Sequence, residues 1–114
     1  MARVADSAMA ATRPGVGEWE VEAALEGAFR ALRATGPAFS SIVGSGANAT
    51  YLHYTSNDRR IEEGDLVLVD AGAEWGMYCS DVTRTFPASG RFTGLIGSSV
   101  RRSVGVWDAR GRPA

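Results

Sequence analysis

The chain has 114 residues, of which 45% are hydrophobic and 22% are charged, a composition typical of one globular domain. Its formal net charge of −1 gives no reason to expect a nucleic acid or an anionic membrane surface as a partner. No apolar run approaches the length of a membrane span. The single cysteine excludes an intrachain disulfide and the N-terminus is a poor signal peptide, so we expect a cytoplasmic protein.

The first third of the chain predicts two helices. Residues 1–11 favour a short helix, which ends at the turn signal of residues 12–15. Apolar residues then recur at helical spacing from about Glu18 to Ala34, and Gly36-Pro37 ends this second helix. We expect the apolar side of the second helix to pack on a core.

The rest of the chain predicts strands joined by turns. Residues 41–46 indicate a short strand that runs into a glycine turn, and residues 51–54 indicate another extended piece. Residues 66–69 are aliphatic on both faces, which predicts a strand that is covered on both sides. A further strand is expected from about Tyr78 to Phe86, ending at Pro87. Helices followed by strands predict an α+β fold.

Two aspartates stand out in this region. If the last two strands form a hairpin that is symmetric about Trp75-Gly76, Asp70 lies directly opposite Asp81. Like charges at such a position are destabilising, unless the two carboxylates share a proton or bind a cation between them. The alternative is that Asp70 belongs to a turn and that Asp81 is paired with Arg84 or Arg60. The spacing alone leaves both interpretations open.

Four blocks of sequence then resemble a known family. They are Ser41–Ala49, Leu52-His53-Tyr54, Gly64–Gly72 and Ser80–Pro87. Their order, spacing and identity closely resemble the Xaa-Pro aminopeptidase and prolidase group of metallopeptidases, over about residues 1–93. The resemblance implies that this α+β chain is the N-terminal part of a pita-bread fold, and an incomplete one.

The resemblance also implies roles for individual residues. Asp70 would chelate one metal ion and Asp81 would bridge two, with manganese as the usual ion and cobalt or zinc as substitutes. His53 would contact the substrate. Thr83 would form a hydrogen bond that supports the site, with simple β-propensity as the alternative. The implied substrate is a peptide with proline at its second position, and a dipeptidase acting on Xaa-Pro remains open.

The remaining ligands of the family's metal site are missing from the sequence. The family site also needs one histidine and two glutamates, whereas this chain has no histidine after His53 and no glutamate after Glu74. We therefore expect two parts: a partial catalytic domain at 1–93 and an unmatched tail at 94–114, rich in glycine, arginine and serine. A frameshift and a genuine short paralogue both explain the tail.

The missing ligands lead to two expectations for this polypeptide. As a member of the family, it would be inactive alone and prone to self-association through open sheet edges. The alternative is a non-enzymatic remnant or packing module that binds a cation weakly at most.

Overall fold

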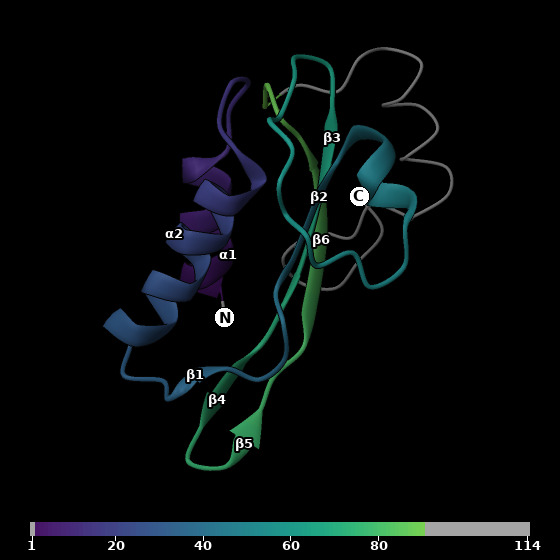
Figure 1. The fold of residues 1–114 in the computed structure, drawn as a ribbon. Helices are drawn as coiled ribbons and strands as arrows, with labels where there is room; N and C mark the ends of the chain where they lie inside the picture. Colours follow the sequence, from purple (N-terminus) through teal and green to yellow (C-terminus); the bar gives the residue numbers. More distant parts are fainter. Residues whose placement is uncertain (1, 91–114) are drawn as a thin grey trace, which may run out of the picture.

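The computed structural model describes residues 2–90, and their side chains from residue 4 on. Figure 1 shows two helices lying together against one side of the strands. No helix in this part of the chain is long and apolar enough to cross a membrane. The elements, in chain order, are α1 (Ala2–Ala11), α2 (Glu18–Ala31), β1 (Gly36–Pro37), β2 (Ile42–Ser45), the 3-10 helix η1 (Gly46–Thr50), β3 (Leu66–Ala71), β4 (Ala73–Trp75), β5 (Tyr78–Cys79) and β6 (Val82–Pro87).

Both expected helices are present, although α2 is three residues shorter than predicted. It begins with a capping interaction in which the Gly17 N–H donates to Glu20 Oε2 at 2.8 Å. It ends before Gly36-Pro37 because Arg33 adopts a left-handed conformation, with φ 69°. The Ala34 N–H then donates to the Phe29 carbonyl at 2.9 Å, which is the bond of a Schellman motif. The backbone therefore stops the helix before the proline does.

The strands form two three-stranded antiparallel sheets. The larger sheet has the order β2-β3-β6, and the smaller one has the order β1-β4-β5. The chain passes from the larger sheet to the smaller one at Gly72, between β3 and β4, and returns at Ser80-Asp81, between β5 and β6. The predicted strand at 78–86 is therefore two strands. Gly72 is required at this crossing, because an added Cβ would collide with the backbone carbonyl of Ser80.

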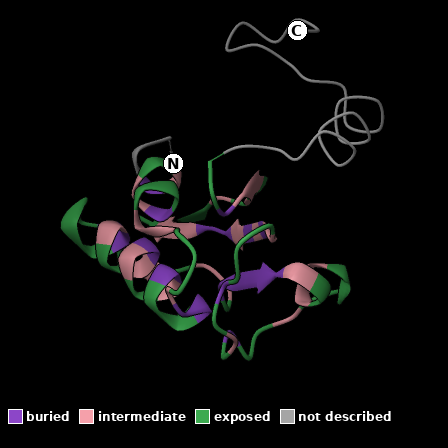
Figure 2. Cartoon of the chain, turned by 90° about the horizontal axis from the view of Figure 1, so that it is seen from above, coloured by how far each residue is buried: buried purple, intermediate pink, exposed green. Residues whose placement is uncertain are grey.

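The core lies between the helices and one face of the larger sheet. Along β3, Val67, Val69 and Ala71 are buried beneath the helices, whereas Leu66, Leu68 and Asp70 on the opposite face are half-buried. Figure 2 shows the same pattern, with buried stretches where helices and strands meet. The prediction of cover on both faces of this strand holds only in part for the described residues, because α1 and α2 pack on the same face and η1 covers only part of the other. The helices contribute Val4, Ala8, Val21, Leu25 and Phe29 to the core.

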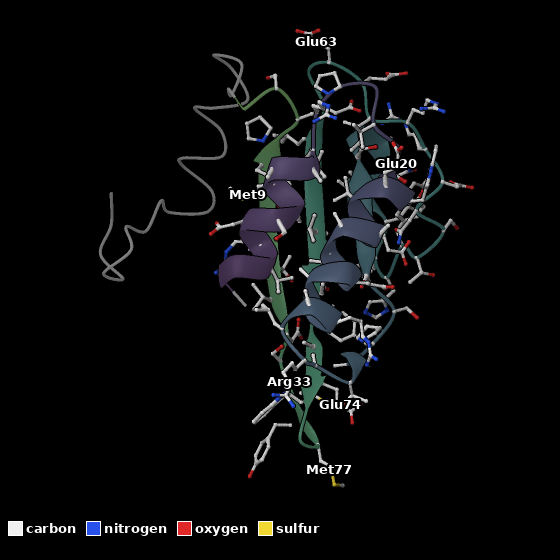
Figure 3. The ribbon with its side chains drawn as sticks, turned by 90° about the vertical axis from the view of Figure 1, so that its left-hand side faces the viewer. Met9, Glu20, Arg33, Glu63, Glu74 and Met77 are labelled. Atoms are coloured by element: carbon white, nitrogen blue, oxygen red, sulfur yellow. The ribbon has the colours of Figure 1, made fainter. Side chains whose placement is uncertain are left out.

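The smaller sheet extends into a projecting hairpin. Its tip is a two-residue turn at Gly76-Met77, whose φ values are 55° and 68°, as a type I′ turn requires. Trp75 pairs with Tyr78 across the turn. Figure 3 shows Met77 at the end of this hairpin, at the opposite end of the molecule from Glu63. The turn is thus centred one residue later than the predicted Trp75-Gly76.

The segment at 51–54 is not a strand. It follows η1 as a turn, in which Tyr51 N–H donates to the Asn48 carbonyl at 3.2 Å. His53 has a left-handed backbone, with φ 53°. Leu52 is 92% exposed, so no burial favours an extended pairing for this segment. A segment of four residues is too short for its sequence pattern to specify a strand.

Candidate metal site

Asp70 lies near the end of β3, on the face of the larger sheet that the helices do not cover. Its Oδ1 atom is buried and is the one such side-chain atom in residues 2–90 that has no hydrogen-bond partner. Burial raises the pKa of the Asp70 carboxyl above its ordinary value, and the neighbouring Asp81 carboxylate raises it further. A hydrogen bond with Thr83 and the proximity of His53 act in the opposite direction. Asp70 therefore lies beside a second carboxylate, and one oxygen of Asp70 has no hydrogen-bond partner.

The hairpin does bring Asp81 close to Asp70, but not in the predicted register. The residue opposite Asp70 is Thr83, and Asp81 lies two residues before it, just outside β6. The register differs by two residues because the turn is at Gly76-Met77 and not at Trp75-Gly76. The two carboxylates are diagonal neighbours on adjacent stretches of chain. Side chains at diagonal positions of an antiparallel pair are still near enough to interact. The same pairing places Thr83 directly across from Asp70.

His53 reaches the same place from the turn after η1. A cavity of about 370 Å³ is lined by His53 together with Asp70 and Asp81. The other residues of its wall are Phe39, Ser40, Ile42 and Thr55. The structure thus brings three of the four predicted site residues to one open cavity. The fourth, Thr83, lines an adjoining cavity that also contains His53 and Asp70.

This donor set fits part of a divalent-cation site. Carboxylate oxygens suit hard ions such as manganese, and the unpartnered Asp70 Oδ1 has a lone pair that a cation could satisfy. However, no three histidine, cysteine, aspartate or glutamate side chains within the described range are arranged closely enough to hold an ion. Two carboxylates make half a coordination shell. Further ligands would have to come from outside residues 2–90.

A buried carboxylate on α2 was missed by the sequence analysis. Glu18, the first residue of α2, is fully buried. Its Oε1 accepts from the Ser45 N–H at 2.9 Å and the Ser45 hydroxyl at 2.6 Å, and from Asn48 Nδ2 at 3.2 Å. Its Oε2 accepts from the Tyr54 hydroxyl at 2.6 Å and the Arg59 N–H at 3.2 Å. Burial alone would raise the pKa of Glu18, but these hydrogen bonds outweigh it and the pKa is lowered.

Glu18 belongs to a stripe of three glutamates on α2. Glu22 accepts from Asn57 Nδ2 at 2.9 Å, and Glu26 accepts from the Ser41 hydroxyl at 3.0 Å. The spacing of four residues puts all three on one side of the helix, where they bind residues 41–59. The sequence offers this signal, since glutamates at i, i+4 and i+8 share a helical face.

Comparison with known proteins gives one consistent result. The model of metallopeptidase family M24 matches residues 1–102. The Xaa-Pro aminopeptidase of Haemophilus influenzae is 50% identical over 86 residues, and that of Escherichia coli is 46% identical over the same length. Each alignment covers 75% of this chain and 20% of the relative. The chain therefore spans about a fifth of the length of these relatives.

Solved structures give the same result at the level of the fold. Aminopeptidase PepP of Pseudomonas aeruginosa superposes with a TM-score of 0.80 and 53% identity, over 82% of this chain and 21% of that one. A variant of Escherichia coli aminopeptidase P superposes with a TM-score of 0.81 and 38% identity, over 93% and 26% of the two chains. The fold is thus part of the pita-bread fold of these enzymes. The chain belongs to metallopeptidase family M24, among relatives that are Xaa-Pro aminopeptidases.

Proposed function

We propose that this chain is part of a metal-dependent aminopeptidase that removes the N-terminal residue preceding proline, and that Asp70 and Asp81 are ligands of its metal centre. The observation that carries the proposal is the buried, unpartnered oxygen of Asp70, beside a second carboxylate at the wall of an open cavity. Without a cation this arrangement is unfavourable, because burial and a like charge both oppose ionisation. A divalent ion between the carboxylates would remove both penalties.

Each residue of the cavity would have a distinct task. Asp70 would bind one ion and Asp81, which is exposed and diagonal to it, would bridge two. Thr83 would keep the Asp70 carboxylate oriented through their hydrogen bond. His53, which lines the same cavity, would contact the peptide. The chemistry that two divalent ions supply in such a site is polarisation of the scissile carbonyl and activation of water.

We propose manganese as the ion and two ions per complete site. The oxygen-only donors on β3 and beside β6 favour a hard ion over zinc or copper, which prefer sites with nitrogen or sulfur ligands. The shell is incomplete within this chain, which has no histidine after His53 and no glutamate after Glu74. We therefore propose that the chain alone binds a cation weakly and does not turn over substrate until other ligands complete the site.

The second candidate function is a non-enzymatic packing module. One observation favours it: α1 and α2 do not cover the face of the larger sheet that carries Leu68 and Asp70, and within residues 2–90 η1 covers only part of it. Such a face could associate with a complementary polypeptide without any catalysis. This candidate predicts association without metal dependence.

Calorimetric titration of the full chain with Mn²⁺ distinguishes these functions. We expect weak binding that is abolished in both Asp70→Asn and Asp81→Asn and retained in Asp6→Asn, which changes an exposed aspartate on α1. Hydrolysis of an Xaa-Pro peptide is measured in parallel and is expected only when the missing ligands are supplied. Equal Mn²⁺ binding by all four proteins would contradict the metal site and favour the packing module.

A further inference from the structure

The turn that carries His53 is held in an unfavourable backbone conformation. A left-handed conformation, such as that of His53 at φ 53°, costs a residue other than glycine a measurable free energy. It persists only where the surroundings determine it. Leu52 is 92% exposed and His53 is itself exposed, so their own side chains provide little packing. The constraint must come from the residues that flank them.

The flanking residues are anchored on Glu18. Asn48, on the near side of the turn, donates to Glu18 Oε1 at 3.2 Å. Tyr54, directly after His53, donates its hydroxyl to Glu18 Oε2 at 2.6 Å. Asn48 Nδ2 also donates to the Tyr54 oxygen at 3.0 Å, which joins the two sides of the turn. Both sides of the turn are therefore bonded to the same buried carboxylate, and the Tyr54 hydroxyl has longer bonds to Asp58 besides.

The same carboxylate also fixes the turn relative to the sheet that carries Asp70. Ser45, the last residue of β2, donates both its N–H and its hydroxyl to Glu18. β2 pairs directly with β3, and Ile42 lies opposite Asp70 in that pairing. Glu18 is thus hydrogen-bonded at once to the turn of His53 and to the strand beside Asp70. Charge-assisted bonds of this length are among the stronger ones in proteins.

We infer that Glu18 and Tyr54 are positioning residues: the buried carboxylate of Glu18, acting through the Tyr54 hydroxyl, holds His53 over the cavity that contains Asp70 and Asp81. The inference deepens the proposed function, and its value for catalysis rests on that proposal. The placement of His53 itself does not depend on a bound metal. It can therefore be tested without activity and without a cation.

The test uses nuclear magnetic resonance on the full, metal-free chain, whose single histidine gives an unambiguous ring signal. Tyr54→Phe removes the hydroxyl, and with it the bond to Glu18 at 2.6 Å and the longer bonds to Asn48 and Asp58. We expect the His53 ring signals to move toward those of a free histidine and the amide protons of residues 51–55 to exchange about tenfold faster. Glu18→Gln is expected to act in the same direction. Tyr51→Phe is the matched control: it changes an exposed tyrosine of the same turn and is expected to leave both measurements unchanged.

Two outcomes would overturn the inference. In the first, Tyr54→Phe leaves the His53 signals and the exchange of residues 51–55 unchanged. In the second, hydrogen exchange at core amides such as that of Val67 accelerates as much as at the amides of the turn. The hydroxyl would then stabilise the whole fold and not the turn in particular. Addition of Mn²⁺ to the unmodified chain then tests the proposed function separately, through paramagnetic broadening of the His53 ring. Absence of broadening would count against the metal site and leave the result for Tyr54 standing.

Discussion

At the scale of single residues, Asp70 is the clearest departure from ordinary packing. Buried polar atoms in proteins are nearly always hydrogen-bonded, and Asp70 Oδ1 is not. The β-strand has no structural need for a charge at this position, since Leu66 and Leu68 precede it on the same face. A residue that costs stability without contributing to packing is expected to serve a ligand.

Substitution of Asp70 tests this cost directly. In metal-free buffer we expect Asp70→Asn to raise the free energy of unfolding by about 0.5 kcal/mol, because it removes the repulsion from Asp81. Added Mn²⁺ should stabilise the unmodified chain and not the variant, which would reverse their order. Urea unfolding with and without Mn²⁺ measures both effects, with Asp6→Asn as the control. A variant that is less stable even without metal would show that Asp70 has a structural role.

Glu18 is the opposite case, a buried carboxylate that is fully satisfied. Because its pKa is lower in the folded chain than the ordinary value of 4.5, its contribution to stability is complete above the pKa of the unfolded state. That contribution is lost as the pH falls through the folded-state pKa. We expect Glu18→Gln to cost about 2 kcal/mol at pH 7 and to make unfolding less dependent on pH below about 4.5.

Urea unfolding between pH 7 and pH 3 measures this dependence. Glu63→Gln serves as the matched control, because Glu63 is exposed in the turn before β3, at the end of the molecule seen in Figure 3. It should leave the stability and its pH dependence nearly unchanged. Identical pH profiles for Glu18→Gln and the unmodified chain would mean that the buried carboxylate does not contribute as its hydrogen bonds indicate.

The sequence predicted the residues of the candidate site better than it predicted how they are arranged. His53, Asp70 and Asp81 were identified before the fold and lie around one cavity. The register between the aspartates was wrong, because it depended on where the turn lies. Met77 takes a left-handed φ of 68°, a conformation that methionine rarely adopts and that composition does not reveal. One residue of error in the turn then became two residues of error in the pairing.

At the scale of secondary-structure elements, the crossing between the two sheets determines where Asp70 and Asp81 meet. The chain leaves β3 at Gly72 and re-enters the larger sheet after Ser80-Asp81. Ser80 closes the crossing, since its hydroxyl accepts from the Ala73 N–H at 3.0 Å. The sequence predicted a continuous strand here because the crossing is a tertiary feature, set by a close approach of two backbones.

Because the backbones of Gly72 and Ser80 lie so close together, one added methyl group at Gly72 should strongly lower stability. In Gly72→Ala the added Cβ would collide with the Ser80 carbonyl, a backbone atom that cannot rotate away. We expect a loss of about 2–4 kcal/mol in the free energy of unfolding and weaker Mn²⁺ binding, because the two aspartates move apart.

Gly27→Ala is the matched control for this substitution. Gly27 lies within α2 with open space around its added Cβ, so alanine should stabilise the helix by about 1 kcal/mol. Thermal or urea unfolding of the two variants gives the comparison. If both variants shift stability in the same direction, the close approach at Gly72 is not a real constraint.

At the scale of the whole molecule, the larger sheet is asymmetric. α1 and α2 cover one face of it and η1 covers only part of the other, and among residues 2–90 β6 pairs only with β3, so its outer edge has no strand partner there. The aliphatic strand 66–69 predicted cover on both faces, and the sequence could not indicate that both α-helices pack on the same face. Long-range packing decides that, and no local pattern records it.

This asymmetry predicts self-association. Open strands present unpaired N–H and C=O groups, and a lysine on such an edge is a common means of blocking pairing. Thr85 is exposed on β6 and lies opposite Leu68, on the face away from α1 and α2. We expect the unmodified chain to form dimers or larger species at tens of micromolar, and Thr85→Lys to weaken this association about tenfold, because a buried, unpaired ammonium at the contact is unfavourable.

Sedimentation equilibrium over a range of concentrations measures the association. Thr35→Lys is the matched control, since it introduces the same charge at an exposed threonine in the loop between α2 and β1, away from the larger sheet. It should leave the dissociation constant unchanged. A monomer at all concentrations would show that the open face is tolerated in water, and association unaffected by Thr85→Lys would place the contact elsewhere, with the projecting hairpin of Trp75, Met77 and Tyr78 as the next surface to test.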